Sequence, residues 1–156
     1  LLGPAWSDEA LWQVAARLTG QSLDAGPDDD HVELAVVGAH LDGQPLNHQL
    51  TDRGATLVAT TRTAPAYRLV ALDGTLLKPG LIRDAAVGAS IEVEVWRLDH
   101  RGFGHFVAEV PAPLTIGTIE LEDATEVHGF LCESEPAASA TDISSFGGWR
   151  AWLARR

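Results

Sequence analysis

The sequence predicts a small α+β fold that is mostly β, a barrel with short flanking helices. Short β-favouring runs separated by turns fill most of residues 32–132, and no alternation of strands with long helices indicates a parallel sheet. Residues 90–98 alternate apolar and polar side chains, as a half-buried strand does. The length of 156 residues is enough for one domain to bury a core without disulfides or metals.

The first thirty residues have a different character from the rest. Residues 7–19 predict an amphipathic helix, with Ser7 as N-cap and Gly20 as the terminating residue. Residues 20–31 are acidic and rich in Gly and Pro, which predicts a solvated linker. Its aspartates at 28–30 suggest a metal, but consecutive side chains point apart, so we expect no metal site. The chain begins without Met and inside a helical pattern, which indicates a piece of a longer protein.

The middle of the chain predicts short strands joined by turns. A buried strand covers residues 34–37 and stops at Gly38, and one or two helical turns within Pro45–Asp52 are closed by Gly54. Strands are then expected at 56–61 and 67–72, followed by a turn at 78–80.

The second half of the chain continues this pattern. In the strand at 90–98 we expect Glu92, Glu94 and Trp96 on the solvent face, although paired carboxylates also suit acid–base chemistry. The remaining expected elements are a helix capped by Asp99 and running through Val107, a rigid segment at 111–113, a hairpin of strands 115–122 and 126–132, and a short helix ending at Leu153.

Composition excludes several classes of function. A formal charge of −11 argues against binding nucleic acid or an anionic membrane surface, because phosphate affinity requires clustered Lys and Arg. With one cysteine, Cys132, the chain has no internal disulfide and no cysteine-based metal site, and its apolar neighbours indicate a buried structural thiol. We find no membrane span, no signal peptide and no nucleotide-binding or hydrolase-elbow motif, so we expect a cytoplasmic protein.

The first candidate site lies beyond the strand at 34–37. Gly38 and Ala39 offer backbone N–H groups, His40 can exchange protons near neutral pH, and Asn47 and Gln49 follow closely. This pattern predicts a site for a small polar ligand, anions included. The alternative is a glycine-bounded surface loop with incidental histidines.

A basic window is the second candidate. Residues 53–72 contain three arginines and no acidic residue, although the chain as a whole is acidic. Arg62 and Arg68 therefore suit an anion-binding site. The alternative is that these arginines are solvated and pack their aliphatic stems on the rim of the barrel.

Several motifs, taken together, resemble the C-terminal domain of allophanate hydrolase. They are VVGAHLDGQPLNHQL (36–50), TRTAPAYRL (61–69), KPGLIR (78–83), IEVEVWRL (91–98), PAPLTIGTIEL (111–121), GFLCE (129–133) and DISSFGGWRAWL (142–153). The run GPAWSDEALWQVAARL (3–18) is similar to the last helix of the amidase-signature domain that precedes it. The resemblance divides the chain into a terminal amidase helix at 1–20, a linker at 21–31 and a barrel domain at 32–156. Val70, Ala124, His128, Gln44 and Trp152 depart from the family pattern as surface or packing changes.

The resemblance implies a γ-glutamyl cyclotransferase-like barrel and a step in the breakdown of urea or cyanuric acid. In that family the amidase domain deaminates allophanate to N-carboxycarbamate with a Ser-cisSer-Lys triad, which lies outside this chain. The C-terminal domain then decarboxylates this product to carbamate. The implied partners are a small dianionic substrate and the amidase domain of the same full-length chain, which can form a homodimer.

This chemistry agrees with the residues available and requires no cofactor. Loss of carbon dioxide from nitrogen leaves the electron pair on nitrogen, so a proton donor replaces the electron sink that carbon decarboxylations need. His40 is the candidate acid, Arg62, Arg68 and Lys78 suit the two carboxylates, and Gly38, Ala39, Asn47 and Gln49 suit substrate orientation. Glu109 is left out, because allophanate hydrolases do not usually keep a carboxylate there.

Two other classes of function remain open. The domain could be a non-catalytic assembly module of the hydrolase complex. It could also be a cyclotransferase-like enzyme acting on γ-glutamyl compounds, in which a glutamate is the acid–base residue.

Overall fold

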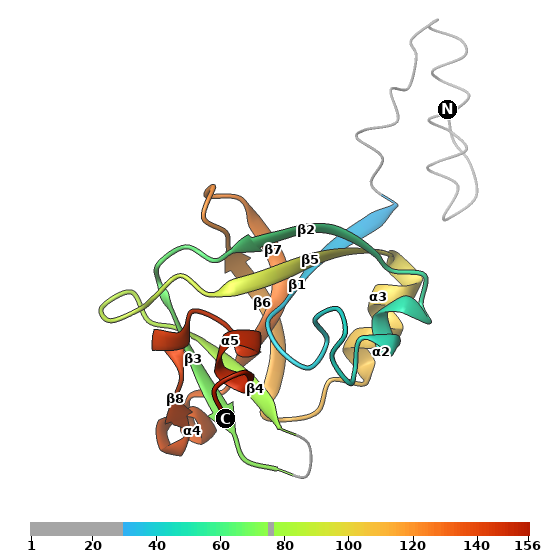
Figure 1. The fold of residues 1–156 in the computed structure, drawn as a ribbon. Helices are drawn as coiled ribbons and strands as arrows, with labels where there is room; N and C mark the ends of the chain where they lie inside the picture. Colours follow the sequence, from blue (N-terminus) through green and yellow to red (C-terminus); the bar gives the residue numbers. More distant parts are fainter. Residues whose placement is uncertain (1–29, 75–76) are drawn as a thin grey trace, which may run out of the picture.

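The computed structural model describes residues 30–74 and 77–156, and these form a mostly β, α+β domain (Figure 1). The predicted helix at 7–19 and nearly all of the linker lie outside the described residues. The strands are β1 (His31–Val36), β2 (Thr56–Arg62), β3 (Tyr67–Leu72), β4 (Lys78–Arg83), β5 (Glu92–Asp99), β6 (Leu114–Glu120), β7 (Glu126–Cys132) and β8 (Thr141–Asp142). The helices are α2 (His48–Thr51), α3 (His100–Ala108), α4 (Ser134–Ser139) and α5 (Trp149–Leu153), with a 3-10 turn, η1, at Ser144–Phe146.

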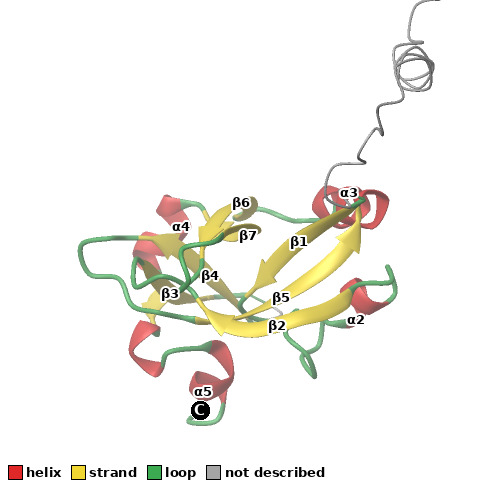
Figure 2. Cartoon of the chain, turned by 90° about the horizontal axis from the view of Figure 1, so that it is seen from above, coloured by secondary structure: helices red, strands yellow, loops and turns green. Residues whose placement is uncertain are grey.

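The strands form two sheets around a shared core. The larger sheet has the order β2-β5-β1-β7-β6, in which β1 runs antiparallel to β5 and parallel to β7. The smaller sheet has the order β4-β3-β8 and is antiparallel throughout. Helices α2 and α3 lie at one end of the larger sheet, and α4 and α5 lie towards the other (Figure 2). The predicted fold class is therefore confirmed. The strands expected in one barrel are divided between two sheets.

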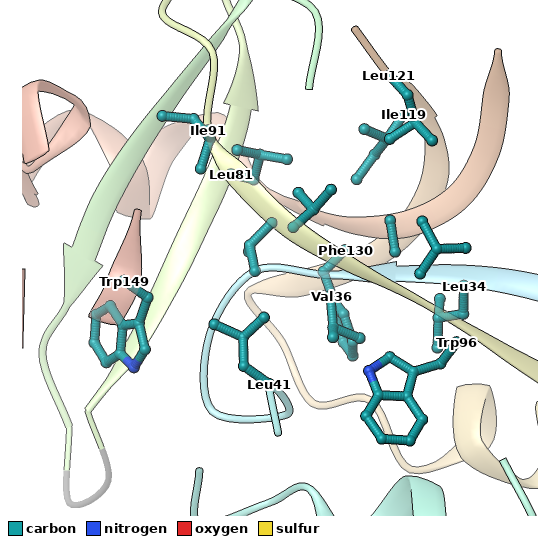
Figure 3. Close-up of a cluster of buried hydrophobic side chains, with 14 of the residues drawn as sticks. Leu34, Val36, Leu41, Leu81, Ile91, Trp96, Ile119, Leu121, Phe130 and Trp149 are labelled. Atoms are coloured by element: carbon teal, nitrogen blue, oxygen red, sulfur yellow. The ribbon is translucent and has the colours of Figure 1, made fainter. Parts of the chain in front are cut away.

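The core is built around the central strands. Leu34 and Val36 of β1 are fully buried, as are Ile91 and Leu81. Leu41, from the loop after β1, enters the same cluster (Figure 3). Because β1 is buried on both faces at its end, the chain that follows it is fixed close to the core.

The prediction that Glu94 and Trp96 of β5 face solvent is wrong. Glu94 is only 2% exposed and Trp96 only 5%. Asp42 of the loop after β1 donates its backbone N–H to Glu94, and Arg150 of α5 pairs with the same carboxylate. The alternating pattern is that of a strand, but a loop and a helix from distant parts of the sequence cover its polar face.

The predicted turn at 78–80 is also wrong, because these residues begin strand β4. Lys78 and Pro79 pair in register with Leu72 and Ala71 of β3. Strand β4 is at the edge of its sheet, where a proline need not donate to a neighbouring strand.

Other predicted elements are confirmed. Asp99 caps α3 by accepting a hydrogen bond from the backbone N–H of Gly102, and β6 and β7 form the predicted hairpin. Helix α5 ends at Leu153 as expected. Helix α4 and the two-residue β8 were not predicted, because their segment has no clear periodicity.

Candidate functional site

A cavity of about 140 Å³ opens beside the loop that follows β1. Its polar lining comes from four separate elements of the chain: His40, Gln49, Lys78 and Glu109. The rest of its wall is apolar: Leu46, Phe106, Val110, Pro111, Leu114 and Phe130. A few converging polar groups in an apolar cavity are typical of small-molecule sites.

His40 lies against the aromatic part of this wall. Its ring stacks on Phe130 with a centroid distance of 5.2 Å and meets the edge of Phe106 at 5.1 Å. The His40 Nε2 atom lies 2.9 Å from Oε1 of Gln49. Because that oxygen can only accept, Nε2 carries the proton and Nδ1 of the neutral ring is unprotonated.

Burial lowers the pKa of His40 from its usual value of 6.5, and the hydrogen bond that Nε2 donates to Gln49 opposes that effect. The positive charge of Lys78 lowers the pKa further, with smaller contributions from His48 and Arg53. The cavity without a ligand therefore contains a neutral imidazole at pH 7.

Backbone hydrogen bonds fix the loop that carries His40. The Leu41 N–H donates to the Gly38 carbonyl, and the Leu46 N–H donates to the Ala39 carbonyl. The side chain of Asn47 donates to the carbonyl oxygen of His40 at 2.9 Å. Asn47 thus holds the loop and is not part of the cavity lining, whereas Gly38 and Ala39 line a small adjoining cavity with His40 and Lys78.

Gly38 explains how Lys78 reaches this site. A Cβ atom at position 38 would come within 2.2 Å of the Pro79 ring. Only glycine allows the loop to approach β4 this closely, and that approach brings Lys78 to the cavity next to His40.

Arg62 and Arg68 do not line this cavity. The guanidinium group of Arg62 donates to the side chain and backbone carbonyl of Ser90 and to the carbonyl of Gly147. Arg68 pairs with Asp142 at 2.8 Å and lies 3.7 Å from Asp84. The structure therefore brings together His40, Gln49, Lys78, Gly38 and Ala39, supported by Asn47, and places the two arginines elsewhere.

The structure adds residues that the sequence analysis did not include in the site. Glu109 lies at the cavity and pairs with Arg53 at 2.7 Å, while Arg53 also donates to the Gln49 carbonyl. Phe106 and Phe130 supply the aromatic wall. Phe106 is on the apolar face of α3, and Phe130 is in the apolar part of β7. In sequence, each therefore has the pattern of an ordinary core residue.

Neither a metal centre nor a membrane span is found in the parts of the chain that the structure describes. His31, His100 and His128 line an open surface groove, but residues 30–74 and 77–156 contain no group of three His, Cys, Asp or Glu side chains that could hold a metal ion. None of the helices in the same ranges is long and apolar enough to cross a membrane. Cys132 is buried, which raises the pKa of its thiol.

Comparison with known proteins shows which proteins the chain resembles. Residues 32–154 match the family described as allophanate hydrolase C-terminal domain. The urea amidolyase of Saccharomyces cerevisiae is 45% identical over 182 aligned positions, which cover 98% of this chain but 10% of that protein. An allophanate hydrolase structure from Kluyveromyces lactis has 42% identity and a TM-score of 0.76, covering 85% of this chain and 23% of that one. This chain thus spans a small part of these longer relatives.

Two further structures bear on the fold. A uropathogenic E. coli-specific protein has 32% identity and a TM-score of 0.74, and the match covers 81% of this chain and 98% of that chain. A gamma-glutamyl cyclotransferase has a TM-score of 0.51 at 9% identity, over 72% of this chain and 69% of that one. At that identity the likeness concerns the fold alone.

Proposed function

The chain belongs to the allophanate hydrolase C-terminal domain family, and we propose that its His40 cavity binds N-carboxycarbamate and catalyses the decarboxylation of this dianion to carbamate. The observation that supports this most directly is that a histidine, His40, and a lysine, Lys78, line the same largely apolar cavity. The histidine is suited to proton transfer, and the lysine is suited to pairing with a carboxylate of the substrate.

The reaction breaks one C–N bond. Carbon dioxide leaves, the bonding electron pair stays on nitrogen, and a proton added to that nitrogen gives carbamate. A positioned proton donor is therefore the main requirement, and general acids of this kind typically contribute about two to four powers of ten in rate.

The cavity provides partners for the substrate at several points. Lys78 would pair with one carboxylate, and the loop at Gly38 and Ala39 would meet the other carboxylate through its backbone. Gln49 would orient the imidazole through the hydrogen bond to Nε2. The aromatic and aliphatic wall would exclude water and strengthen these electrostatic contacts.

Protonation of His40 would be coupled to substrate binding. In the free cavity the pKa of His40 is lowered by burial and by Lys78, so the ring is neutral near pH 7. A dianion placed beside the ring reverses the sign of the local potential and raises this pKa. Nδ1, unprotonated before substrate binds, would then take up a proton from solvent and deliver it to the nitrogen that keeps the electron pair as carbon dioxide leaves.

We further propose a domain organisation that gives a two-step arrangement. We assign residues 1–20 to the last helix of an amidase domain, 21–31 to a linker and 32–156 to the barrel domain that receives the amidase product. The relatives named urea amidolyase and allophanate hydrolase are much longer chains, as this assignment requires. The step would then serve the breakdown of urea or cyanuric acid in the cytoplasm.

The test is release of carbon dioxide from N-carboxycarbamate produced in situ by a separate amidase domain. Adding the chain should accelerate the release beyond the uncatalysed rate in proportion to its concentration. If the rate does not change while the added chain is folded, the domain is not a decarboxylase and an assembly role is favoured.

A second candidate is a cyclotransferase-like activity on γ-glutamyl compounds, which the position of Glu109 at the cavity favours. The carboxylate of Glu109 is paired with Arg53, so it would have to leave that ion pair to act as an acid–base group. Release of an amine from a γ-glutamyl amine by the wild-type chain, lost in Glu109→Gln, would support this reaction over decarboxylation.

A further inference from the structure

The loop that carries His40 is fastened at Asp42 by groups from two distant elements. The backbone N–H of Asp42 donates to Oε2 of Glu94 in β5 at 2.7 Å. The backbone carbonyl of Asp42 accepts from Nη2 of Arg150 in α5 at 2.8 Å. Both polar backbone groups of one residue, two positions after His40, are thus held by the Glu94–Arg150 ion pair.

Glu94 forms the buried half of this ion pair. Besides Asp42, its Oε2 atom accepts from the indole N–H of Trp96 at 3.1 Å, and its Oε1 atom pairs with Arg150. Trp96 and Leu41 lie in the same core cluster (Figure 3). A buried carboxylate with several donors has one favourable arrangement, so the position of Asp42 is closely defined.

Arg150 extends the network to the C-terminal helix. It donates to Glu92 at 2.8 Å in addition to Glu94 and Asp42, so one guanidinium group joins three acceptors. These acceptors belong to β5 and to the His40 loop, both far from residue 150 in sequence. The side chains of this network, Glu92, Glu94, Trp96 and Arg150, do not line the cavity.

We propose that Arg150 and Glu94 are positioning residues for His40, which hold the loop so that the imidazole stays between Phe106, Phe130 and Gln49. This inference rests on the proposed function for its catalytic meaning, but the geometry of His40 can be measured without the reaction. A change at the network would act on His40 through Asp42 and Leu41, and a 1 Å displacement of a catalytic group is enough to cost about a hundredfold in rate.

The experiment must separate positioning from a direct electrostatic effect. The charged or titratable groups around His40 are Lys78, His48 and Arg53, with Glu109 across the cavity. Removing the cation in Arg150→Met would raise the His40 pKa through space, whereas removing the anion in Glu94→Gln would lower it. A loosened loop exposes the ring to water in both variants and raises the His40 pKa in both.

The His40 ring is therefore titrated by NMR in the full 156-residue chain, and malonate affinity is measured by calorimetry. We expect a raised His40 pKa and about tenfold weaker malonate binding in Arg150→Met and in Glu94→Gln. Arg150→Lys keeps the charge but cannot serve three acceptors, so it should fall between wild type and Arg150→Met.

Arg97→Met is the matched control. Arg97 is on the same strand as Glu94 and pairs with Glu33 at 2.8 Å, but its ion pair does not contact the His40 loop. It should leave the His40 pKa and malonate affinity unchanged.

Opposite pKa changes in Arg150→Met and Glu94→Gln, or unchanged values in both folded variants, would overturn the positioning role. If Glu94→Gln fails to fold, the test uses wild type, Arg150→Lys and Arg150→Met. Malonate affinity that does not fall in this order would overturn the positioning role. If the wild-type chain neither binds malonate nor releases carbon dioxide, the proposed function fails, and the His40 pKa series still tests the positioning.

Discussion

The His40 cavity and the segment of Arg62 and Arg68 contain almost all of the predicted site residues, and they satisfy their polar groups in different ways. Around His40, Asn47 donates to the backbone carbonyl and Gln49 accepts from Nε2, so Nδ1 of the ring remains for a ligand. The two arginines donate instead to protein carbonyls and carboxylates. The difference shows that residue type alone does not mark a binding site, because the same guanidinium chemistry also holds protein segments together.

The largest expected effect is that of His40→Ala on the reaction. We expect decarboxylation to slow by about two to four powers of ten, because the proton donor is lost. The measurement is carbon dioxide release from N-carboxycarbamate generated by an amidase domain, with Arg68→Ala as the control expected to retain wild-type rate. A folded His40→Ala chain as fast as wild type would remove His40 from the mechanism.

Lys78→Met should have the next largest effect. Loss of the ammonium group should weaken malonate binding by about ten- to a hundredfold, because a charge-assisted contact to a carboxylate contributes on the order of 1.5–3 kcal/mol. Calorimetric titration of Lys78→Met and Arg68→Met with malonate shows which of the two regions binds the ligand, and only Lys78→Met should lose affinity. Equal losses of affinity in both variants would show that the ligand reaches Arg68.

Arg62→Ala tests the structural side of the comparison. This change leaves the Ser90 carbonyl without its Arg62 donor, and the Gly147 carbonyl keeps only the backbone N–H of Glu92, so we expect the free energy of unfolding to fall by about 1–3 kcal/mol. Denaturant titration gives the stability, and malonate affinity should not change. Intact stability with lost affinity would place Arg62 in the binding site.

A smaller effect concerns pH. Burial lowers the pKa of His40 below 6.5, so above that pH both the folded and unfolded chains have a neutral ring. As the pH falls through 6.5 the unfolded state takes up the proton first, and the free energy of unfolding decreases until the folded state is also protonated. His40→Gln lacks this contribution. Unfolding of both chains at about pH 7.5 and about pH 5.5 should show a steeper loss for wild type, and parallel losses would contradict the lowered pKa.

The smallest effect is expected when residues 1–29 are deleted, which leaves β1 whole. We predict a change in Tm of no more than about 2 °C, because the proposed assignment of these residues to a linker and another domain gives them little part in the barrel core. The E. coli relative, whose chain is almost entirely covered by this fold, supports the idea that the domain is independent. Loss of the cooperative transition would show that the deleted residues belong to the barrel.

Much of the fold could be predicted from local patterns. Val36 and Val37 before Gly38 identify the end of the first strand, and Asp99 before a helical run identifies the start of α3. The face of Glu94 was predicted wrongly because alternation shows which residues share a face, not what covers it. Arg150, which neutralises that carboxylate, lies 56 positions away.

Only part of the candidate site could be predicted from the sequence. The loop residues from Gly38 to Gln49 are close in sequence and remain close in the structure. Lys78 reaches the cavity through the contact between Gly38 and Pro79, which depends on the pairing of β3 and β4. Phe106 and Phe130 could not be distinguished from core residues, since only the packing of α3 against β7 directs both rings to His40.

The most direct test of the comparison is the location of a bound dicarboxylate. A crystal structure of the chain with malonate should show one carboxylate against Lys78 and the ligand within hydrogen-bonding distance of the His40 ring. Malonate bound at Arg62 or Arg68, with the His40 cavity free of ligand, would contradict the assignment of this cavity as the functional site.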